Sequence, residues 1–258
     1  MTVHERQPRR PRVFVDAPLA SGACVTLSPE RSHHLIDVLR LKPGAALLLF
    51  DGRGDDWSAT LSTPGKRADV RVQARVPNAC ESPLGITLWQ GLSQGTRMDA
   101  CLRQGVELGI VGFRPMLTQR SAGKPDAKRA RKKHEHWTAI AVSAAEQSGR
   151  AVVPHVHELA TPATHLGDAP PRSIEAGTLA LVLLPDATRT LGEVAQNTVP
   201  ERTELMIGPE SGLDEREAEA AVAAGFLPVR IGPRVLRTET AGPAAIAVLQ
   251  ARFGDLAR

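Results

Sequence analysis

The sequence predicts an α/β protein in which a mostly parallel sheet with flanking helices follows a small β-rich barrel. Between residues 12 and 76, short apolar runs alternate with turn residues such as Pro-Gly, Asp-Gly and Gly-Asp, which is typical of a series of short strands. From residue 84 onward, apolar strand-like runs alternate with segments of helical period, which favours a parallel sheet covered by helices. The segment PNACESPLG at residues 77–85 separates the two patterns and is predicted to be a linker.

In the first region, the strands are expected within RVFVD, LKPGAALLLFDGRGDDWSATL and KRADVRVQARV, which begin at residues 12, 41 and 66. One short helix is expected after Ser28, because Ser is a common N-cap and Pro29 suits a first helical turn. So many turns in so short a region favour a small barrel over an α/β domain.

In the second region, strands are expected in ITLWQGL, VGFRPMLTQ, TLALVLLPDA, TELMIGPESG and FLPVRIG, which begin at residues 86, 111, 178, 203 and 226. Helices are expected to begin near residues 96, 125, 213 and 238. The second of these helices is expected to end at Gly149, since Gly is common just past a helix end.

Charge and hydropathy indicate a cytoplasmic protein with no membrane segment. No apolar run approaches the roughly 20 residues of a membrane span, and the N-terminus is polar and basic rather than signal-like. The net charge of +4 conceals two basic clusters, one in the N-terminal arm and one at residues 124–133. Either cluster is compatible with a solvated face or with a surface that contacts phosphates.

Several classes of site are excluded or disfavoured. The chain has neither a phosphate-binding G-x-x-x-x-G-K-[ST] loop nor a G-x-G-x-x-G fingerprint, which argues against nucleoside triphosphates and nicotinamide cofactors. Its three cysteines are widely spaced, which argues against a disulfide framework and a zinc motif. Its histidine pairs have no neighbouring carboxylate or cysteine cluster. No metal site is expected.

Three loops that follow apolar strands are the candidates for a binding site. They contain LLPDA, IGPESG and IGPRVLRTETA, and the last two share an Ile-Gly-Pro start. Ligands of parallel sheets bind beyond the carboxyl ends of strands, and Gly lets the backbone approach a ligand closely. Such loops suit an adenine or a sulfonium-bearing amino acid, although tight strand-to-helix turns look the same.

The stretch GPESGLDEREAEAAVAAGFLPVRIGPRVLRTETA resembles the C-terminal signature of the bacterial ribosomal RNA small-subunit methyltransferase E family. QGVELGI and AAEQSGRAVVP are similar to further motifs of that family, and HHLIDVLRLKPGAALLLFDGRG resembles its PUA-like barrel. The resemblance runs in order along nearly the whole chain. Three positions depart from the family pattern, namely Gln94, Gly105 and Ser211, of which the first two replace lysines and put RNA contacts there in doubt.

The resemblance implies an S-adenosylmethionine-dependent enzyme of the SPOUT superfamily that methylates N3 of a uridine in 16S ribosomal RNA, within the small subunit. It implies a PUA-like RNA-binding domain at residues 1–78 and a methyltransferase domain at residues 84–258, with a C-terminal trefoil knot and a homodimer. Two alternatives remain open: a non-catalytic RNA-binding assembly factor, and a SPOUT methyltransferase that acts on another RNA.

Site residues carry over from the family motifs. The cofactor-binding positions are Leu183, Leu184, Pro185, Gly208, Pro209, Glu210, Gly212, Ile231, Gly232, Pro233, Leu236 and Thr238. Arg237 is the expected catalytic residue, either by stabilising negative charge at a carbonyl oxygen of uracil or by anchoring the target phosphate. Glu239 is either a base or, with more support, a helix-start residue. The predicted RNA-binding residues are Arg12, Arg40, Lys42, Arg120, Lys124, Arg129, Lys132, Arg150 and Arg234.

Overall fold

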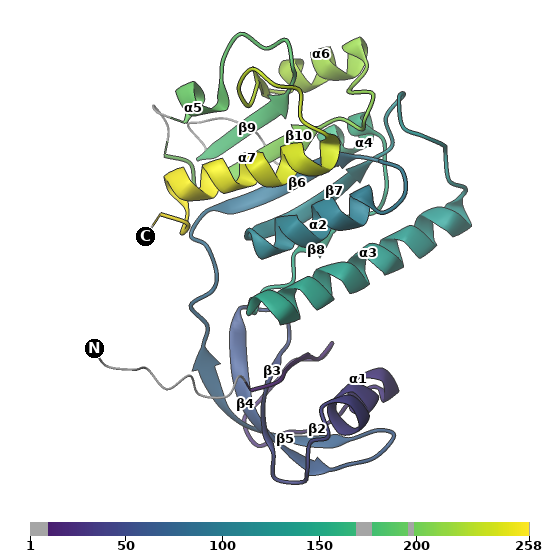
Figure 1. Cartoon of the computed structure of the whole chain (residues 1–258), viewed down its shortest axis with the longest axis vertical. Coiled ribbons are helices and arrows are strands. Elements are labelled where there is room, and N and C mark those ends of the chain that lie inside the picture. Colours follow the sequence, from purple (N-terminus) through teal and green to yellow (C-terminus); the bar gives the residue numbers. More distant parts are fainter. Residues whose placement is uncertain (1–9, 169–176, 196–198, 258) are drawn as a thin grey trace. The chain divides into compact units, whose positions relative to one another are not determined.

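The computed structural model describes residues 10–168, 177–195 and 199–257, which form two compact units (Figure 1). Unit 1 contains Met1–Glu81 together with Ala145–Val153, and unit 2 contains Ser82–Ala144 together with Pro154–Arg258. Arg6 and Arg9, which belong to the basic cluster of the N-terminal arm, lie outside the described residues. No helix in the described part of the chain has the length and apolar character needed to cross a bilayer.

Unit 1 is built on a curled five-stranded sheet in the order β1-β3-β4-β5-β2. Its strands are β1 (Arg12–Phe14), β2 (Cys24–Thr26), β3 (Ala46–Phe50), β4 (Asp55–Thr63) and β5 (Asp69–Pro77). β1 pairs in parallel with β3 and the other pairs are antiparallel. Two register shifts between β4 and β5 mark irregularities of the kind that increase local twist, which helps a short sheet to curl.

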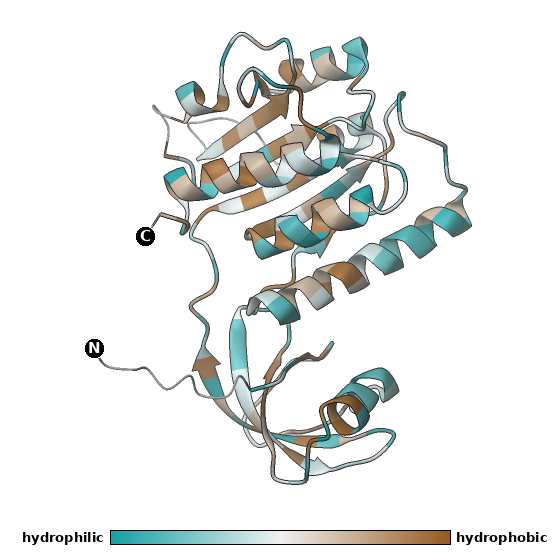
Figure 2. Ribbon diagram, in the orientation of Figure 1, coloured by the Kyte–Doolittle hydropathy of each residue, from teal (hydrophilic) through white to brown (hydrophobic). Residues whose placement is uncertain are grey.

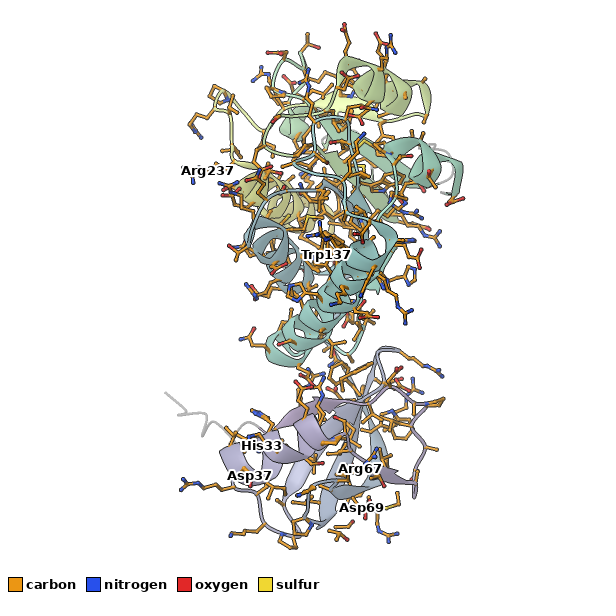
Figure 3. All side chains as sticks on the ribbon, turned by 90° about the vertical axis from the view of Figure 1, so that its right-hand side faces the viewer. His33, Asp37, Arg67, Asp69, Trp137 and Arg237 are labelled. Carbon is orange, nitrogen blue, oxygen red and sulfur yellow. The ribbon has the colours of Figure 1, made fainter. Side chains whose placement is uncertain are left out.

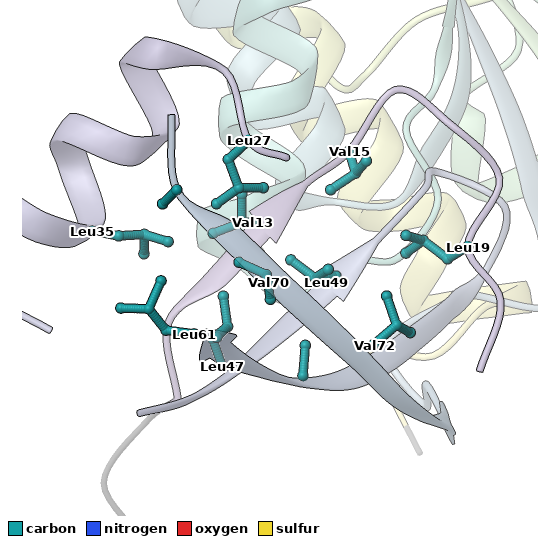
Figure 4. Packing of buried hydrophobic residues seen from close by; sticks show 12 residues of the cluster. Val13, Val15, Leu19, Leu27, Leu35, Leu47, Leu49, Leu61, Val70 and Val72 are labelled. Atoms are coloured by element: carbon teal, nitrogen blue, oxygen red, sulfur yellow. The ribbon is translucent and has the colours of Figure 1, made fainter. Parts of the chain in front are cut away.

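A short helix closes one side of this sheet. Helix α1 (Pro29–His33) begins as predicted, because the N–H of Arg31 donates to the Ser28 hydroxyl at 3.3 Å. It continues into one π-helical turn, η1 (His34–Val38), which carries the fully buried Leu35 into the core. Figure 4 shows that core, in which Leu47, Leu49 and Leu61 come from the sheet. Burial of each such leucine stabilises the fold by about 1.5–3 kcal/mol.

Charged side chains bind the segment Ala145–Val153 to the sheet of unit 1. The Arg12 guanidinium donates to Asp56 at 2.6 Å and to the carbonyls of Ala145 and Arg150 at 3.2 and 3.1 Å. The Glu146 carboxylate accepts from the N–H of Phe14 at 2.8 Å. This segment, distant in sequence, therefore completes the first unit.

Unit 2 is a six-stranded sheet in the order β11-β9-β10-β6-β7-β8, and all of its described strand pairs are parallel. The strands are β6 (Gly85–Gly91), β7 (Ile110–Met116), β8 (His155–Val156), β9 (Thr178–Leu183), β10 (Arg202–Ile207) and β11 (Leu227–Val229). The predicted class, a parallel α/β sheet after a β-rich region, is confirmed. The strands are largely apolar, as the brown of β6 and β9 in Figure 2 shows.

Helices cover both faces of this sheet. They are α2 (Arg97–Glu107), α3 (Ala127–Ser148), α4 (Pro162–Asp168), α5 (Leu191–Val194), α6 (Glu215–Ala223) and α7 (Thr238–Phe253). On one face, Trp89 and Met206 pack with Ala221 of α6 and with Phe226. On the other face, the neighbouring residue Gln90 contacts Cys101 of α2 and Thr238 of α7. Successive strand residues point to opposite faces, so α2 and α7 lie opposite α6.

Helices α4 and α5 and the short strand β8 were not anticipated from the sequence. The start of helix α5 does have a sequence signal, because Thr190 and Glu193 form a reciprocal capping box. The second predicted helix does end before Gly149, whose φ is +88°. The trefoil knot stays a prediction of the resemblance.

Candidate cofactor-binding site

A cavity of about 500 Å³ lies at the carboxyl ends of β9, β10 and β11. Its walls are the three loops predicted from the sequence and the first residues of α7. All of the predicted cofactor-binding positions line it, namely Leu183, Leu184, Pro185, Gly208, Pro209, Glu210, Gly212, Ile231, Gly232, Pro233, Leu236 and Thr238. Cavities that bind small molecules typically measure about 300–1,000 Å³, so the space suits a ligand the size of a nucleoside derivative.

Two glycines fit the walls for different reasons. A Cβ on Gly208 would lie 2.6 Å from the backbone nitrogen of Leu213, so the loop closes on itself too tightly for any side chain. Gly232 has a φ of +92° and open space where a Cβ would stand. The backbone at Gly232 is therefore accessible to a ligand in a conformation that other residues rarely adopt.

The third loop offers unused backbone donors. The N–H groups of Ile231, Gly232 and Leu236 donate no hydrogen bond to any residue that the structure describes. Amides left without a protein partner at a cavity wall are the groups that recognise the edge of a heterocycle such as adenine. The residues present thus fit a nucleoside-bearing cofactor.

Two predicted arginines stand at the cavity mouth. Arg234 and Arg237 are both exposed and both line the cavity. Arg237 is the N-cap residue of α7, with extended backbone and no capping hydrogen bond from its side chain. Figure 3 shows it at the surface of unit 2. In the described residues, its guanidinium forms no hydrogen bond or ion pair, which leaves it available to a substrate.

Arg97 is a lining residue that the sequence did not single out. Its Nη1 donates to Glu210 at 2.8 Å, and its Nε lies 3.7 Å from Glu239. Glu210 also accepts from the backbone N–H of Gln94 at 3.1 Å. Burial acts to raise the pKa of Glu210, but its own N–H, Arg97 and Gln94 together lower it. The Glu210 N–H and Arg97 therefore favour the charged form of this carboxylate of the cofactor loop.

Glu239 lines the cavity from the first turn of α7. One of its carboxylate oxygens, Oε2, is buried and has no hydrogen-bond partner among the described residues. The other oxygen faces Arg97. This geometry is compatible with both predicted roles of Glu239.

The predicted RNA-binding residues fall into three groups. The first group is exposed, in agreement with a role at the surface, and consists of Arg40, Lys42, Lys124, Arg129, Lys132 and Arg234. Arg120 is exposed but donates to the carbonyl of Ser211 at 3.0 Å, so it also supports the cofactor loop. Arg12 and Arg150 are turned inward: Arg12 joins the network described above, and Arg150 is 3% exposed and binds Glu81 at 2.8 Å. Both of these side chains are thus engaged within unit 1.

The part of the chain that the structure describes contains no cluster of three or more histidine, cysteine, aspartate or glutamate side chains arranged to hold a metal. His155 and His157 do lie together, with ring centroids 4.3 Å apart, but Arg114 raises the electrostatic potential around His157. A neighbouring cation opposes metal binding.

Comparison with known proteins connects both units with RNA methylation. Residues 80–250 match the family model of an RNA methyltransferase domain, and residues 27–73 match the model of the RNA methyltransferase PUA domain. The ribosomal RNA small subunit methyltransferase E of Synechocystis is 34% identical over 89% of this chain and 73% of its own length. The chain belongs to the ribosomal RNA small subunit methyltransferase E family.

Other members of the family are similar over most of their length. The member from Bacillus subtilis is 30% identical, over 84% of this chain and 85% of its own. The crystal structure of the member from Neisseria gonorrhoeae, bound to S-adenosylmethionine, is 35% identical with a TM-score of 0.86 and covers 96% of this chain and 100% of that one. A methyltransferase from Legionella pneumophila in complex with the same cofactor is 34% identical with a TM-score of 0.87, at 96% and 100% coverage. The resemblance predicted from the sequence is confirmed.

Proposed function

We propose that this protein transfers a methyl group from S-adenosylmethionine to N3 of a uridine in 16S ribosomal RNA of the small subunit. The observation that carries the proposal is the cavity at the carboxyl ends of β9, β10 and β11, whose walls are the family motifs. Family membership and the cofactor in two similar crystal structures support it.

The chain's own residues would hold the cofactor mainly through backbone. Leu183 to Pro185 and Gly208 to Gly212 supply two walls, and the N–H groups of Ile231, Gly232 and Leu236 would donate to the adenine. When bound, S-adenosylmethionine supplies the methyl group: its S–CH₃ bond breaks, an N3–CH₃ bond forms, S-adenosylhomocysteine leaves and the N3 proton passes to solvent. Much of the rate then comes from orientation of the two reactants.

Uracil N3 is a poor nucleophile until it loses its proton, so the site must favour the anionic base. Arg237 is the cation placed for this task, since it lines the cavity and is free of contacts in the described residues. We assign it to the negative charge that develops on a uracil carbonyl oxygen. Arg97 is less suited, because it is occupied by Glu210 and Glu239.

The RNA itself needs a wider surface than the cavity. We assign RNA contacts to exposed cations in each unit by itself. In unit 1 these are Arg40 and Lys42, and in unit 2 they are Arg120, Lys124, Arg129, Lys132 and Arg234. Each phosphate that a cation neutralises releases counterions and makes binding sensitive to salt. With only 3% aromatic residues, a broad stacking platform is not available, so we expect the target base to flip into the cavity.

The proposal includes the wider expectations from the family. These are an RNA-binding domain at residues 1–78, a knotted methyltransferase domain at residues 84–258, a homodimer and a cytoplasmic location. Sedimentation velocity of the purified protein measures the oligomeric state directly.

Two measurements test the function. Calorimetry with S-adenosylmethionine is expected to show binding, whereas a non-catalytic assembly factor gives no heat. Mass spectrometry of ribosomal RNA from cells that lack the protein is expected to show loss of one methyluridine from 16S RNA. An unchanged set of modified nucleosides, or a loss from another RNA, would contradict the proposed substrate.

A further inference from the structure

A buried amide lies directly behind the cofactor cavity. Gln90, near the end of β6, is 1% exposed. Its Nε2 donates to the Thr238 hydroxyl at 2.8 Å and lies 3.3 Å from the Gly208 carbonyl, and the same hydroxyl donates to Gly208 at 2.9 Å. Gly208 and Thr238 both line the cavity, one from the loop after β10 and one from the start of α7. One side chain thus joins two walls of the cavity.

The other end of this amide is fixed by a thiol. The Sγ–H of Cys101, on α2, donates to Gln90 Oε1 at 3.2 Å. Burial, assisted by the charge of Glu239, raises the pKa of Cys101 to about 12, so the thiol keeps its proton. With the thiol donating to the amide oxygen, the NH₂ group of Gln90 is directed toward Gly208 and Thr238.

The backbone around the amide leaves little room for another arrangement. A Cβ on Gly91 would lie 2.4 Å from the nitrogen of Pro209, so the end of β6 touches the cofactor loop directly. The side chain of Gln90 therefore sits at a point where β6, α2, the loop after β10 and α7 converge. A shift of any of them moves the cavity wall.

We propose that Gln90 is a positioning residue, which holds the loop at Gly208 against the start of α7 and so sets the affinity of the cavity for S-adenosylmethionine. The inference rests on the proposed function, because it assumes that this cavity takes that cofactor. Gln90 does not line the cavity, so it acts through Gly208 and Thr238 and not by contact with the ligand.

The test compares two buried glutamines in unit 2. Gln250 is also fully buried, donates to the Leu108 carbonyl at 3.0 Å and accepts from Ser82 at 2.6 Å, but it does not line the cavity. Gln90→Met and Gln250→Met therefore remove similar hydrogen bonds at different distances from the site. Both variants are expected to melt at a lower temperature than wild type. Only Gln90→Met is expected to raise the Kd for S-adenosylmethionine, by about tenfold, as loss of two hydrogen bonds implies.

Two more variants separate positioning from general stability. In Gln90→Glu, only the protonated acid can donate, so the ratio of its Kd to that of wild type is expected to rise from pH 6 to pH 9. In steady-state assays of Gln90→Met, KM for the cofactor is expected to rise while kcat at saturation stays within about threefold of wild type. Cys101→Ser keeps a donor to the Gln90 amide, so it is expected to bind S-adenosylmethionine more tightly than Cys101→Ala. This pair of variants also tests the inference if Gln90→Met does not fold.

Calorimetry on the whole chain with S-adenosylmethionine gives the decisive outcomes. Three results would each overturn the inference while the proposed function stands. The first is wild-type affinity for S-adenosylmethionine in Gln90→Met, and the second is an equal loss of affinity in Gln250→Met. The third is a ratio of the Gln90→Glu Kd to the wild-type Kd that does not change with pH. If Gln90→Met does not fold, equal affinities of Cys101→Ser and Cys101→Ala overturn it. Absence of binding by the wild-type protein would overturn the proposed function, and the inference with it.

Discussion

Arg97 Nη1 lies 2.8 Å from Oε1 of Glu210 and thereby joins the start of α2 to the loop after β10. Both side chains are partly exposed, at 43% and 32%, so the pair contributes modestly. Pairs of this kind are worth about 0.2–1 kcal/mol. The contact is nevertheless placed at the cavity wall, where a small change in loop position alters ligand affinity.

A double-mutant cycle of Arg97→Met and Glu210→Gln tests this contact. Each single variant is expected to weaken S-adenosylmethionine binding about two- to fivefold. The double variant is expected to lose less binding free energy than the sum of the two single losses. Calorimetry measures the coupling. Arg131→Met is the matched control, because the Arg131–Glu135 pair on α3 is distant in sequence from every lining residue and more exposed. Strict additivity of the two losses would show that the contact has no role in the site.

Arg237→Ala is expected to bind the cofactor with wild-type affinity but to lower kcat about 100-fold. The reason is that a cation or hydrogen-bond donor aimed at developing charge contributes on the order of 10²–10³ in rate. Arg237→Lys keeps the charge and is expected to recover part of the loss. Single-turnover methylation of 16S RNA gives the rates, and full turnover by Arg237→Ala would contradict the assigned role.

Combined reversal of Lys124, Arg129 and Lys132 to Glu is expected to weaken RNA binding and to flatten its dependence on salt. Each lost phosphate contact lowers the slope of log K against log[salt] by about 0.7–0.9. Fluorescence anisotropy between low and moderate salt measures the slope. Arg216→Glu, an exposed position on α6 outside the proposed surface, is the control. An unchanged slope in the triple variant would contradict the prediction and would mean that these residues form an ordinary solvated face.

Acid is expected to destabilise unit 2 through His157. Burial, with the charges of Arg114, His155 and His165, lowers the pKa of His157 from 6.5 to about 4. Between about pH 6.5 and pH 4 the unfolded chain binds a proton at this position that the folded protein does not bind, so the free energy of unfolding falls as pH falls. Urea unfolding at pH 7, 5.5 and 4.5 is expected to show a shallower decline for His157→Gln than for wild type.

His33 supplies the control for that experiment. It lies in unit 1 and pairs with Asp37 at 2.7 Å with its side chain 69% exposed. In His33→Gln, the free energy of unfolding of unit 2 is expected to fall with pH as it does in wild type. A His157→Gln curve parallel to wild type would mean that other groups govern the acid sensitivity.

The sequence predicted the features that depend on local chemistry. Ser28 capped the helix that it was expected to cap, and the three strand-end loops meet at one cavity because parallel strands place their carboxyl ends at one edge. Arg97 and Gln90 were not predicted, because the cavity-wall residues that they bind, Glu210 and Thr238, lie more than one hundred residues away in the chain. The sequence shows the charge of Arg12 but not its contacts with Asp56 and with the carbonyls of residues 145–150, because these also lie far away in the chain.

The segment Ala145–Val153 gives the first unit an unusual order of assembly. Glu81 binds the side chain of Arg150 and the N–H groups of Ala151 and Val152. Arg12, which also binds Asp56, donates to carbonyl oxygens of the same segment. During synthesis, the first unit therefore gains its complete set of contacts only after residue 153 has been added to the chain. A fragment that ends at Glu81 would leave Arg12 without the three carbonyls that it binds, so a single cut of the chain cannot yield the first unit with all of its contacts.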